Sequence, residues 1–103
     1  MFSWYQIVEA CEMLFEATRN DKYRNLALKW AKEYQVIQPM FAWAYGVEVK
    51  YSKDPTEKQR ALALALFLDQ NSERIQGISE SEKQQALKWL STNNPFRQAE
   101  PPA

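Results

Sequence analysis

The sequence contains no histidine, and it has only one cysteine and two glycines among 103 residues. Without histidine, the side chain that most often serves as a general base or metal ligand near neutral pH is missing. A single cysteine cannot form an intramolecular disulfide, and two glycines leave little material for a phosphate-binding loop. These absences argue against an enzyme, and we predict no catalytic, cofactor-binding or metal-binding residue.

The chain also lacks an excess of charge of either sign, because 13 Lys and Arg residues balance 13 Asp and Glu residues. A nucleic-acid-binding surface needs clustered excess cations, so we expect no nucleic-acid partner. No apolar run approaches the ~20 residues of a membrane-spanning helix. The first ten residues contain no basic residue of the kind that begins a signal peptide. We therefore expect a protein of the cytoplasm with no membrane segment.

Two charged stretches leave alternatives open. Basic residues gather between positions 19 and 32, where they form either a phosphate-contacting surface or the solvent-exposed side of an amphipathic helix. Glu9, Glu12 and Glu16 form the densest acidic stripe, which is either a solvated face or a group of carboxylates available for chemistry. The zero net charge and the absence of a supporting motif favour the solvent-exposed interpretation in both cases.

The longest apolar run covers residues 61–68 and reads ALALALFL. Because eight residues make more than two turns of an α-helix, every face of such a helix is apolar and must be covered by neighbours. Alanine and leucine are strong helix formers without β-branching, which favours a helix over a strand. Asp54 as N-cap, Pro55 at the first helical position and Glu57 three residues after the cap mark the start. We predict a central helix over residues 55–70.

Two further helices begin with a capping-box pattern, in which a serine is followed three residues later by Gln or Glu. Ser3 and Gln6 predict a first helix that ends near residue 17. Ser79 and Glu82 predict a last helix that ends near residue 92.

Apolar residues at three- and four-residue spacing predict a second helix over residues 22–35. Pro39 suits the first turn of a third helix over residues 39–51. Gly46 lies in the middle of that helix, where glycine costs roughly 1 kcal/mol relative to alanine. We take this glycine to indicate the close approach of another helix.

Together these patterns predict an all-α fold, a five-helix antiparallel array. We expect a single helical domain over residues 1–97. The remaining residues, 98–103, contain prolines and no apolar bulk beyond alanine, so we expect a disordered tail.

The first four predicted helices agree best with an internal repeat at an offset of 34 residues, which places residues 5–38 over residues 39–72. The predicted turns at residues 18–21 and 52–55 then coincide. Identical residues in this superposition are Ala10 and Ala44, Ala27 and Ala61, Leu28 and Leu62, and Ala31 and Ala65.

With Tyr45-Gly46, Ala65 and the turn Asp69-Gln70-Asn71 at characteristic positions, residues 5–72 resemble the tetratricopeptide repeat family. The resemblance implies two helical hairpins, with residues 79–91 in the place of a terminal capping helix. The chain departs from the family pattern at positions where the family has glycine, small residues or proline, namely Glu12, Arg24, Lys58 and Gln70. A plain five-helix bundle explains the same periodicity, so both arrangements stay open.

The resemblance implies a groove lined by the first helix of each hairpin. The partner-binding residues that it predicts are Glu9, Met13, Glu16, Met40, Trp43, Val47, Lys50 and Tyr51. Such a groove is acidic in the first unit and apolar and aromatic in the second, which suits a protein segment with an aliphatic or aromatic anchor and one or two basic residues. The family's clamp for acidic C-terminal peptides uses Lys, Arg and Asn on this face, whereas Glu9 and Trp43 stand there in this chain.

These observations predict a non-enzymatic adaptor or regulator that binds a protein or peptide partner. The alternative is a structural homo-oligomer or a small inhibitor protein that acts through an exposed aromatic surface, with Phe2, Trp4 and Trp89 as candidates for a dimer interface. The sequence leaves open whether Trp43 lies in the groove or in the core.

Overall fold

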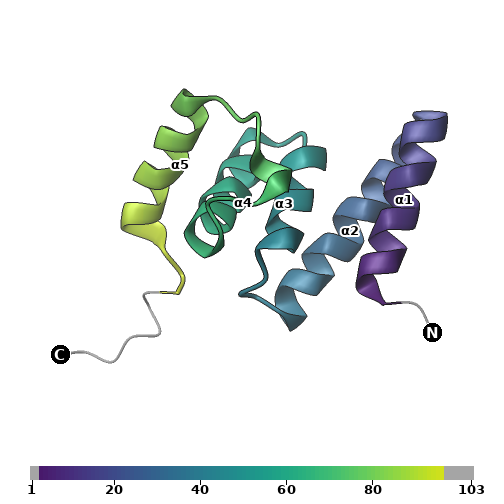
Figure 1. Ribbon diagram of the computed structural model, residues 1–103, viewed down its shortest axis with the longest axis horizontal. Helices are drawn as coiled ribbons and strands as arrows, with labels where there is room; N and C mark the ends of the chain where they lie inside the picture. The colour runs from purple at the N-terminus through teal and green to yellow at the C-terminus, as the bar shows by residue number, and fades with distance from the viewer. Residues whose placement is uncertain (1–2, 97–103) are drawn as a thin grey trace.

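Five α-helices and one short 3₁₀-helix make up the computed structural model, which describes residues 3–96 (Figure 1). The part of the chain so described contains no β-strand, and the predicted all-α array of five helices is confirmed. The predicted tail at residues 98–103 and the dimer candidate Phe2 lie outside the described residues. The elements are α1 (Trp4–Thr18), α2 (Asp21–Ile37), α3 (Ala42–Tyr51), α4 (Pro55–Leu68), η1 (Glu73–Ile75) and α5 (Glu80–Asn93).

The helix starts that the capping patterns predict are confirmed. In α1 the Gln6 amide donates to the Ser3 hydroxyl at 3.2 Å, and the Gln6 side chain accepts from the Ser3 amide at 3.0 Å. At the start of α5 the Ser79 hydroxyl accepts from the Glu82 amide at 3.1 Å. Asp54 caps α4 by accepting from the amides of residues 56 and 57 at 2.9 and 3.3 Å. These side chains satisfy backbone donors that the first turn of a helix leaves free.

The predicted start of the third helix at Pro39 is wrong, because α3 begins at Ala42 with Phe41 as its N-cap. Pro39 and Met40 form a turn instead, in which the Phe41 amide donates to the Gln38 carbonyl at 3.2 Å. The Tyr45 hydroxyl donates to the Pro39 carbonyl at 2.6 Å. Two boundaries also shift, since α2 continues to Ile37 and α4 ends at Leu68.

The helices follow one another in space as they do in sequence, each packing against the helix before and the helix after it (Figure 1). The 3₁₀-helix η1 lies in the connection between α4 and α5, and it packs against α3 and α4. The structure extends over 50 × 33 × 22 Å. Within residues 3–96, none of the helices combines the length and the apolar character needed to cross a membrane.

Two apolar clusters form the core, and α3 contributes to both. The first joins α1, α2 and α3 through buried residues that include Val8, Ala31 and Val47. The second joins α3, α4, η1 and α5, and it contains all of residues 61–65 of the predicted central helix. Burial of this run between α3 and α5 explains why it carries no polar residue, although Phe67 near the end of α4 is 46% exposed.

Candidate functional site

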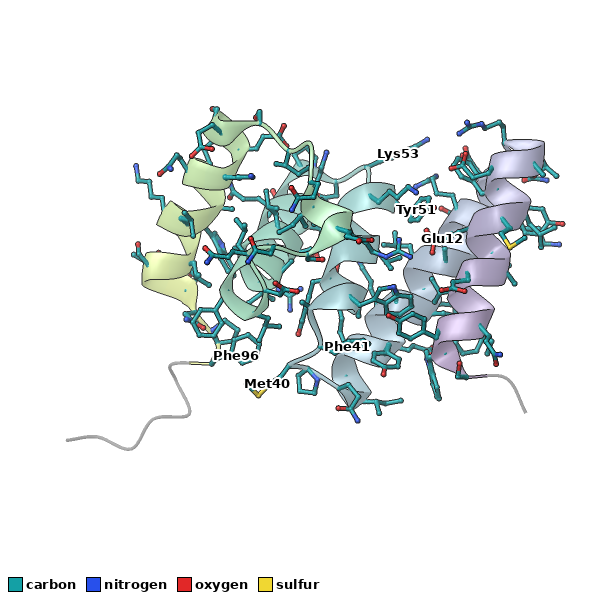
Figure 2. All side chains as sticks on the ribbon, in the orientation of Figure 1. Glu12, Met40, Phe41, Tyr51, Lys53 and Phe96 are labelled. Carbon is teal, nitrogen blue, oxygen red and sulfur yellow. The ribbon has the colours of Figure 1, made fainter. Side chains whose placement is uncertain are left out.

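A charged cluster links α1, α3 and η1 on one side of the array. The Arg74 guanidinium of η1 donates two hydrogen bonds to the Glu12 carboxylate of α1, at 2.9 Å to Oε2 and 2.7 Å to Oε1. The Tyr51 hydroxyl of α3 donates to Glu12 Oε2 at 2.8 Å, and Lys50 Nζ lies 3.9 Å from the same oxygen. Figure 2 shows Glu12 and Tyr51 next to each other between α1 and α3. Two parallel hydrogen bonds between an arginine and a carboxylate hold both groups in a defined orientation.

The ionised states of this cluster depend on one another. Burial by itself raises the pKa of Glu12, but the hydrogen bonds from Arg74 and Tyr51 and the positive charges of Arg74 and Lys50 outweigh it, so the pKa lies below its usual value. Burial and the hydrogen bond to Glu12 raise the pKa of Tyr51. Glu12 is therefore a carboxylate at neutral pH, and Tyr51 is a neutral hydrogen-bond donor.

Trp43 of α3 lies between the charged cluster and a group of aromatic rings. Its ring stacks on Tyr5 of α1, with the centroids 4.1 Å apart and an interplanar angle of 14°. The Arg74 guanidinium carbon lies 5.3 Å from the centroid of the Trp43 ring, within the range of a cation–π interaction. Tyr34 and Phe41 complete the group, with centroids 5.9 and 6.0 Å from that of Trp43. The open question about Trp43 has an intermediate answer, because its side chain is partly buried against the cluster that joins α1, α2 and α3 and also lines a surface hollow.

A surface hollow of about 640 Å³ opens beside this aromatic group, and we name it the aromatic hollow. One wall is Tyr5 and Glu9 of α1, the floor is residues 40–43, and the other wall is Leu68 with residues 69 and 71–74 of the α4–α5 connection. Met40 and Phe41 lie at the lower end of α3 in Figure 2. Among the described residues, three carboxylates line the hollow, those of Glu9, Asp69 and Glu73, and one cation, Arg74, which is paired with Glu12.

The structure separates the eight predicted partner-binding residues. Three of them, Glu9, Met40 and Trp43, line the aromatic hollow. Met13 and Glu16 are exposed on α1 outside it, and Met13 is 72% exposed. Lys50 lines an adjacent hollow of about 630 Å³ that contains Glu12.

The prediction that Val47 and Tyr51 line a groove is wrong. Val47 is 0% exposed and Tyr51 is 4% exposed, because both point into the cluster that joins α1, α2 and α3. Sequence reasoning also missed Tyr5, Phe41 and the entire wall from the α4–α5 connection, including Arg74. The close approach predicted at Gly46 is made by the short 3₁₀-helix η1 and not by an α-helix, since a Cβ placed at Gly46 would lie 2.7 Å from Arg74 Cβ.

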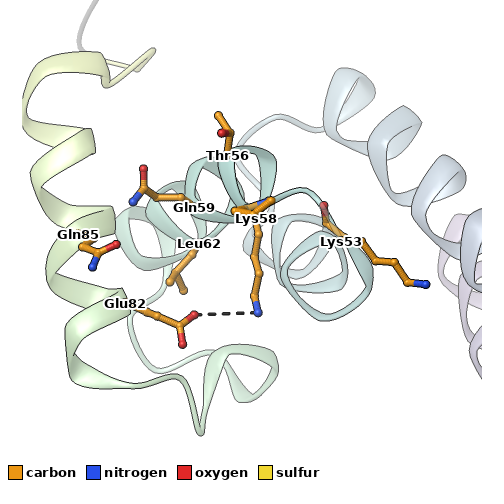
Figure 3. A pocket seen from close by; sticks show the side chains of 9 residues that line it. Lys53, Thr56, Lys58, Gln59, Leu62, Glu82 and Gln85 are labelled. Carbon is orange, nitrogen blue, oxygen red and sulfur yellow. Dashed lines mark ion pairs between the residues drawn. The ribbon is translucent and has the colours of Figure 1, made fainter.

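A different hollow, of about 480 Å³, lies between α4 and α5 near the turn that precedes α4 (Figure 3). Leu62 forms part of its lining, and most of the other lining residues are polar. Lys58 reaches from α4 toward Glu82 of α5, with Nζ and Oε2 4.0 Å apart (Figure 3). Lys53 is the second lysine among the described lining residues, and its Nζ lies 3.8 Å from Asp21 Oδ2, outside the hollow.

Glu48 of α3 is fully buried between α2 and α3, away from the aromatic hollow. Its Oε1 accepts a hydrogen bond from the Gln35 amide at 2.8 Å, whereas Oε2 has no hydrogen-bond partner and lies 3.8 Å from Lys32 Nζ. Burial raises the pKa of Glu48, although the hydrogen bond from Gln35 and the charge of Lys32 oppose this effect.

The basic residues between positions 19 and 32 are partly neutralised by neighbouring carboxylates. Arg19 lies 3.3 Å from Glu16, Arg24 lies 3.3 Å from Asp21, and Lys32 lies near Glu48. Residues 3–96 contain no group of three or more Cys, Asp or Glu side chains arranged to hold a metal ion.

The two tryptophans proposed for a dimer interface already have partners within the chain. Trp4 meets Trp30 and Tyr34 edge-on, at centroid distances of 6.3 and 6.2 Å. Trp89 is partly buried against the cluster formed by α3, α4 and α5.

Comparison with known proteins finds no matching family, no matching curated protein and no matching solved structure.

Proposed function

We propose that this protein is a non-enzymatic interaction module, an adaptor or regulator that binds a partner protein segment in the aromatic hollow. The partner segment carries one aliphatic or aromatic anchor and one or two basic residues. The observation that carries this proposal is the combination of aromatic and acidic residues around one opening, formed by α1, α3 and the α4–α5 connection.

The apolar part of the hollow supports an anchor side chain. Met40 is 68% exposed and Tyr5 is 39% exposed, so apolar surface stands open to solvent next to the packed rings of Phe41 and Trp43. Methionine adapts its shape to different apolar side chains, and aromatic rings offer large rigid contact areas. An anchor that covers this surface gains the free energy of removing it from water.

The charges of the hollow support a basic segment. Glu9 stands on one wall, and Asp69 and Glu73 stand on the other. Arg74 does not offset them, because its charge is balanced by Glu12. A Lys or Arg placed between these walls meets a negative potential, which favours a basic partner over an acidic one and accelerates its association.

A direct test starts from a phage-displayed library of random peptides selected on the purified protein. We expect the selected peptides to share an aromatic or aliphatic residue and at least one Lys or Arg. A fluorescently labelled consensus peptide then gives the dissociation constant by fluorescence anisotropy. Met40→Asp and Glu9→Lys should each weaken binding by about tenfold, a typical loss for a residue at the centre of an interface.

The chain offers matched controls for both substitutions. Met13 is as exposed as Met40 but lies outside the hollow, and Glu16 lies on α1 as Glu9 does but also outside it. Met13→Asp and Glu16→Lys should therefore leave the dissociation constant unchanged. A library that yields no binding peptide, or a peptide that binds Met40→Asp as tightly as the wild type, would refute the proposal.

We also propose that the helices form tetratricopeptide-like hairpins and that the protein works in the cytoplasm. The packing of each helix against its sequence neighbours is in keeping with a short helical repeat. The single cysteine, Cys11, is buried and free, which suits a reducing compartment.

A further inference from the structure

We propose that Arg74 is a positioning residue for the aromatic hollow: its ion pair with Glu12 sets the spacing between the α1 wall and the wall formed by the α4–α5 connection. The Glu12–Arg74 pair thereby keeps the hollow at the width that the partner needs, and this consequence for binding rests on the proposed function. The arrangement of the two walls can be measured without any partner.

Helix α1 is attached to the rest of the protein mainly through α2. Within the part of the chain that the structure describes, the backbone of α1 comes close only to that of α2, and its contacts with α3 are made by side chains such as Val8 and Tyr5. Among the hydrogen bonds and ion pairs within residues 3–96, those that join α1 to the α4–α5 connection are all made by Glu12 and Arg74. This pair is therefore the direct polar link between the two walls.

Both residues of this link, Glu12 and Arg74, are held in place by further contacts. Glu12 also accepts the hydrogen bond from Tyr51 of α3, which orients the carboxylate toward Arg74. The Arg74 side chain passes directly over Gly46 and its guanidinium lies beside Trp43, so the stem and the head both contact α3. A bidentate pair fixes direction as well as distance, which a single charge–charge contact does not.

The α4–α5 connection contains a residue buried in the core next to residues that are exposed at the hollow. Ile75, next to Arg74 in η1, is 1% exposed and belongs to the core shared by α3, α4 and α5. Glu73, on the other side of Arg74, is exposed and lines the hollow together with Asp69 and Asn71. Arg74 thus joins an anchored residue to the residues that face a partner, and it is the one that reaches across to α1.

The test measures the distance between the walls by pulsed electron paramagnetic resonance. Spin labels are placed at Met13→Cys on α1 and Gln70→Cys in the α4–α5 connection, in a Cys11→Ala background. Both labelled residues are exposed and neither lines the hollow. In the double variant Glu12→Gln with Arg74→Gln, which preserves the net charge, we expect the mean distance to shift by more than about 2 Å or the distribution to broaden clearly.

A second pair of labels serves as the control for a general loosening. Met13→Cys with Glu33→Cys spans only α1 and α2, so its distance should not change in the double variant. An unchanged Met13–Gln70 distance distribution in a folded double variant would overturn the proposal, as would an equal change in both label pairs.

If circular dichroism shows that the double variant does not fold, the same distance is measured in Arg74→Lys instead. Lysine keeps the charge but not the two parallel hydrogen bonds, so a broadened distribution supports the proposal and an unchanged one overturns it.

The consequence for binding is measured with the selected peptide. In unlabelled protein, the double variant should bind it about tenfold more weakly, within the usual range of coupling between two sites. Arg74→Lys should fall between the double variant and the wild type. Equal affinity for all three proteins would show that the Glu12–Arg74 pair does not hold the hollow at the width that the partner needs. Failure of the wild type to bind any peptide would instead refute the proposed function, while the distance measurement would still test the role of Arg74.

Discussion

Glu48 shows at the scale of a single residue how burial and charge oppose each other. It is the one fully buried charged side chain among residues 3–96. Lys32 of α2 and Arg60 and Glu57 of α4 contribute the charges that act on it, and burial is the largest effect on its pKa, which is raised. A carboxyl group whose pKa is higher in the folded state stabilises the fold when protonated, and this contribution is lost as the pH rises through the folded-state pKa.

Glu48→Gln should therefore raise the free energy of unfolding at neutral pH by about 1 kcal/mol, the lower end of the cost of a buried polar atom without a hydrogen bond. The advantage should shrink as the pH falls through the raised folded-state pKa of Glu48, and it should be smallest below the ordinary pKa of glutamate, where the wild-type side chain is protonated in both states. Urea denaturation followed by circular dichroism at several pH values measures this difference in the free energy of unfolding. Glu33→Gln, at an exposed position of α2, should have no effect. A variant that is less stable than the wild type at neutral pH would show that the Lys32 ion pair outweighs the cost of burial.

At the scale of elements, the contact between α3 and η1 depends on a missing side chain. Alanine in place of Gly46 would improve the intrinsic helix propensity of α3 by roughly 1 kcal/mol. Its Cβ would lie 2.7 Å from Arg74 Cβ, which belongs to the stem of that side chain and not to its flexible end. We expect Gly46→Ala to destabilise the protein by about 1 kcal/mol or more, because the displacement of η1 costs more than the helix gains.

A double-mutant cycle tests whether this steric clash is the cause of the destabilisation by Gly46→Ala. Arg74→Gly removes the side chain that the new Cβ meets, so Gly46→Ala should be stabilising when it is added to Arg74→Gly. The stabilities of the wild type, the two single variants and the double variant are compared by thermal unfolding. The same destabilisation by Gly46→Ala in both backgrounds would show that the close approach of Arg74 is not the reason for the glycine.

At the scale of the whole molecule, the order of the helices in space predicts an order of opening. The two apolar clusters share α3, whereas, within residues 3–96, the backbones of α1 and α5 each come close to that of a single neighbouring α-helix. In such an array the end elements open at lower free energy than the middle ones. Amide hydrogen exchange measured by mass spectrometry should therefore be slowest in α3 and α4 and fastest in α1 and α5. Equal protection in all five helices would show that the array opens as one cooperative unit.

The sequence predicted helix starts well wherever the deciding contacts are local. Ser3, Asp54 and Ser79 cap their helices through amides two or three residues away. Pro39 has the right chemistry for a helix start, but a hydrogen bond from Tyr45 to its carbonyl accompanies a turn at that position. A local pattern identifies a residue that is able to begin a helix, whereas more distant contacts select among the positions that are able to do so.

The candidate site was predictable only in part, for a reason that α3 illustrates. Residues 44–49 of this helix are all buried, so its apolar periodicity did not reveal which side faces α1. Of the residues predicted to bind a partner, Glu9, Met40 and Trp43 line one hollow, whereas Val47 and Tyr51 belong to the core. Arg74 gave no signal, because it lies outside any periodic segment and its partner is 62 residues away in the chain.

The sequence by itself therefore determined the all-α class, the capped starts of α1, α4 and α5, and the burial of the run at residues 61–65. These properties follow from capping, propensity and periodicity, which act within a few residues. Only the tertiary structure decided which side of α3 faces solvent, where the hollow opens, and that Arg74 meets Glu12. Burial and ion pairing depend on what distant parts of the chain bring to the same place, and no local pattern contains that information.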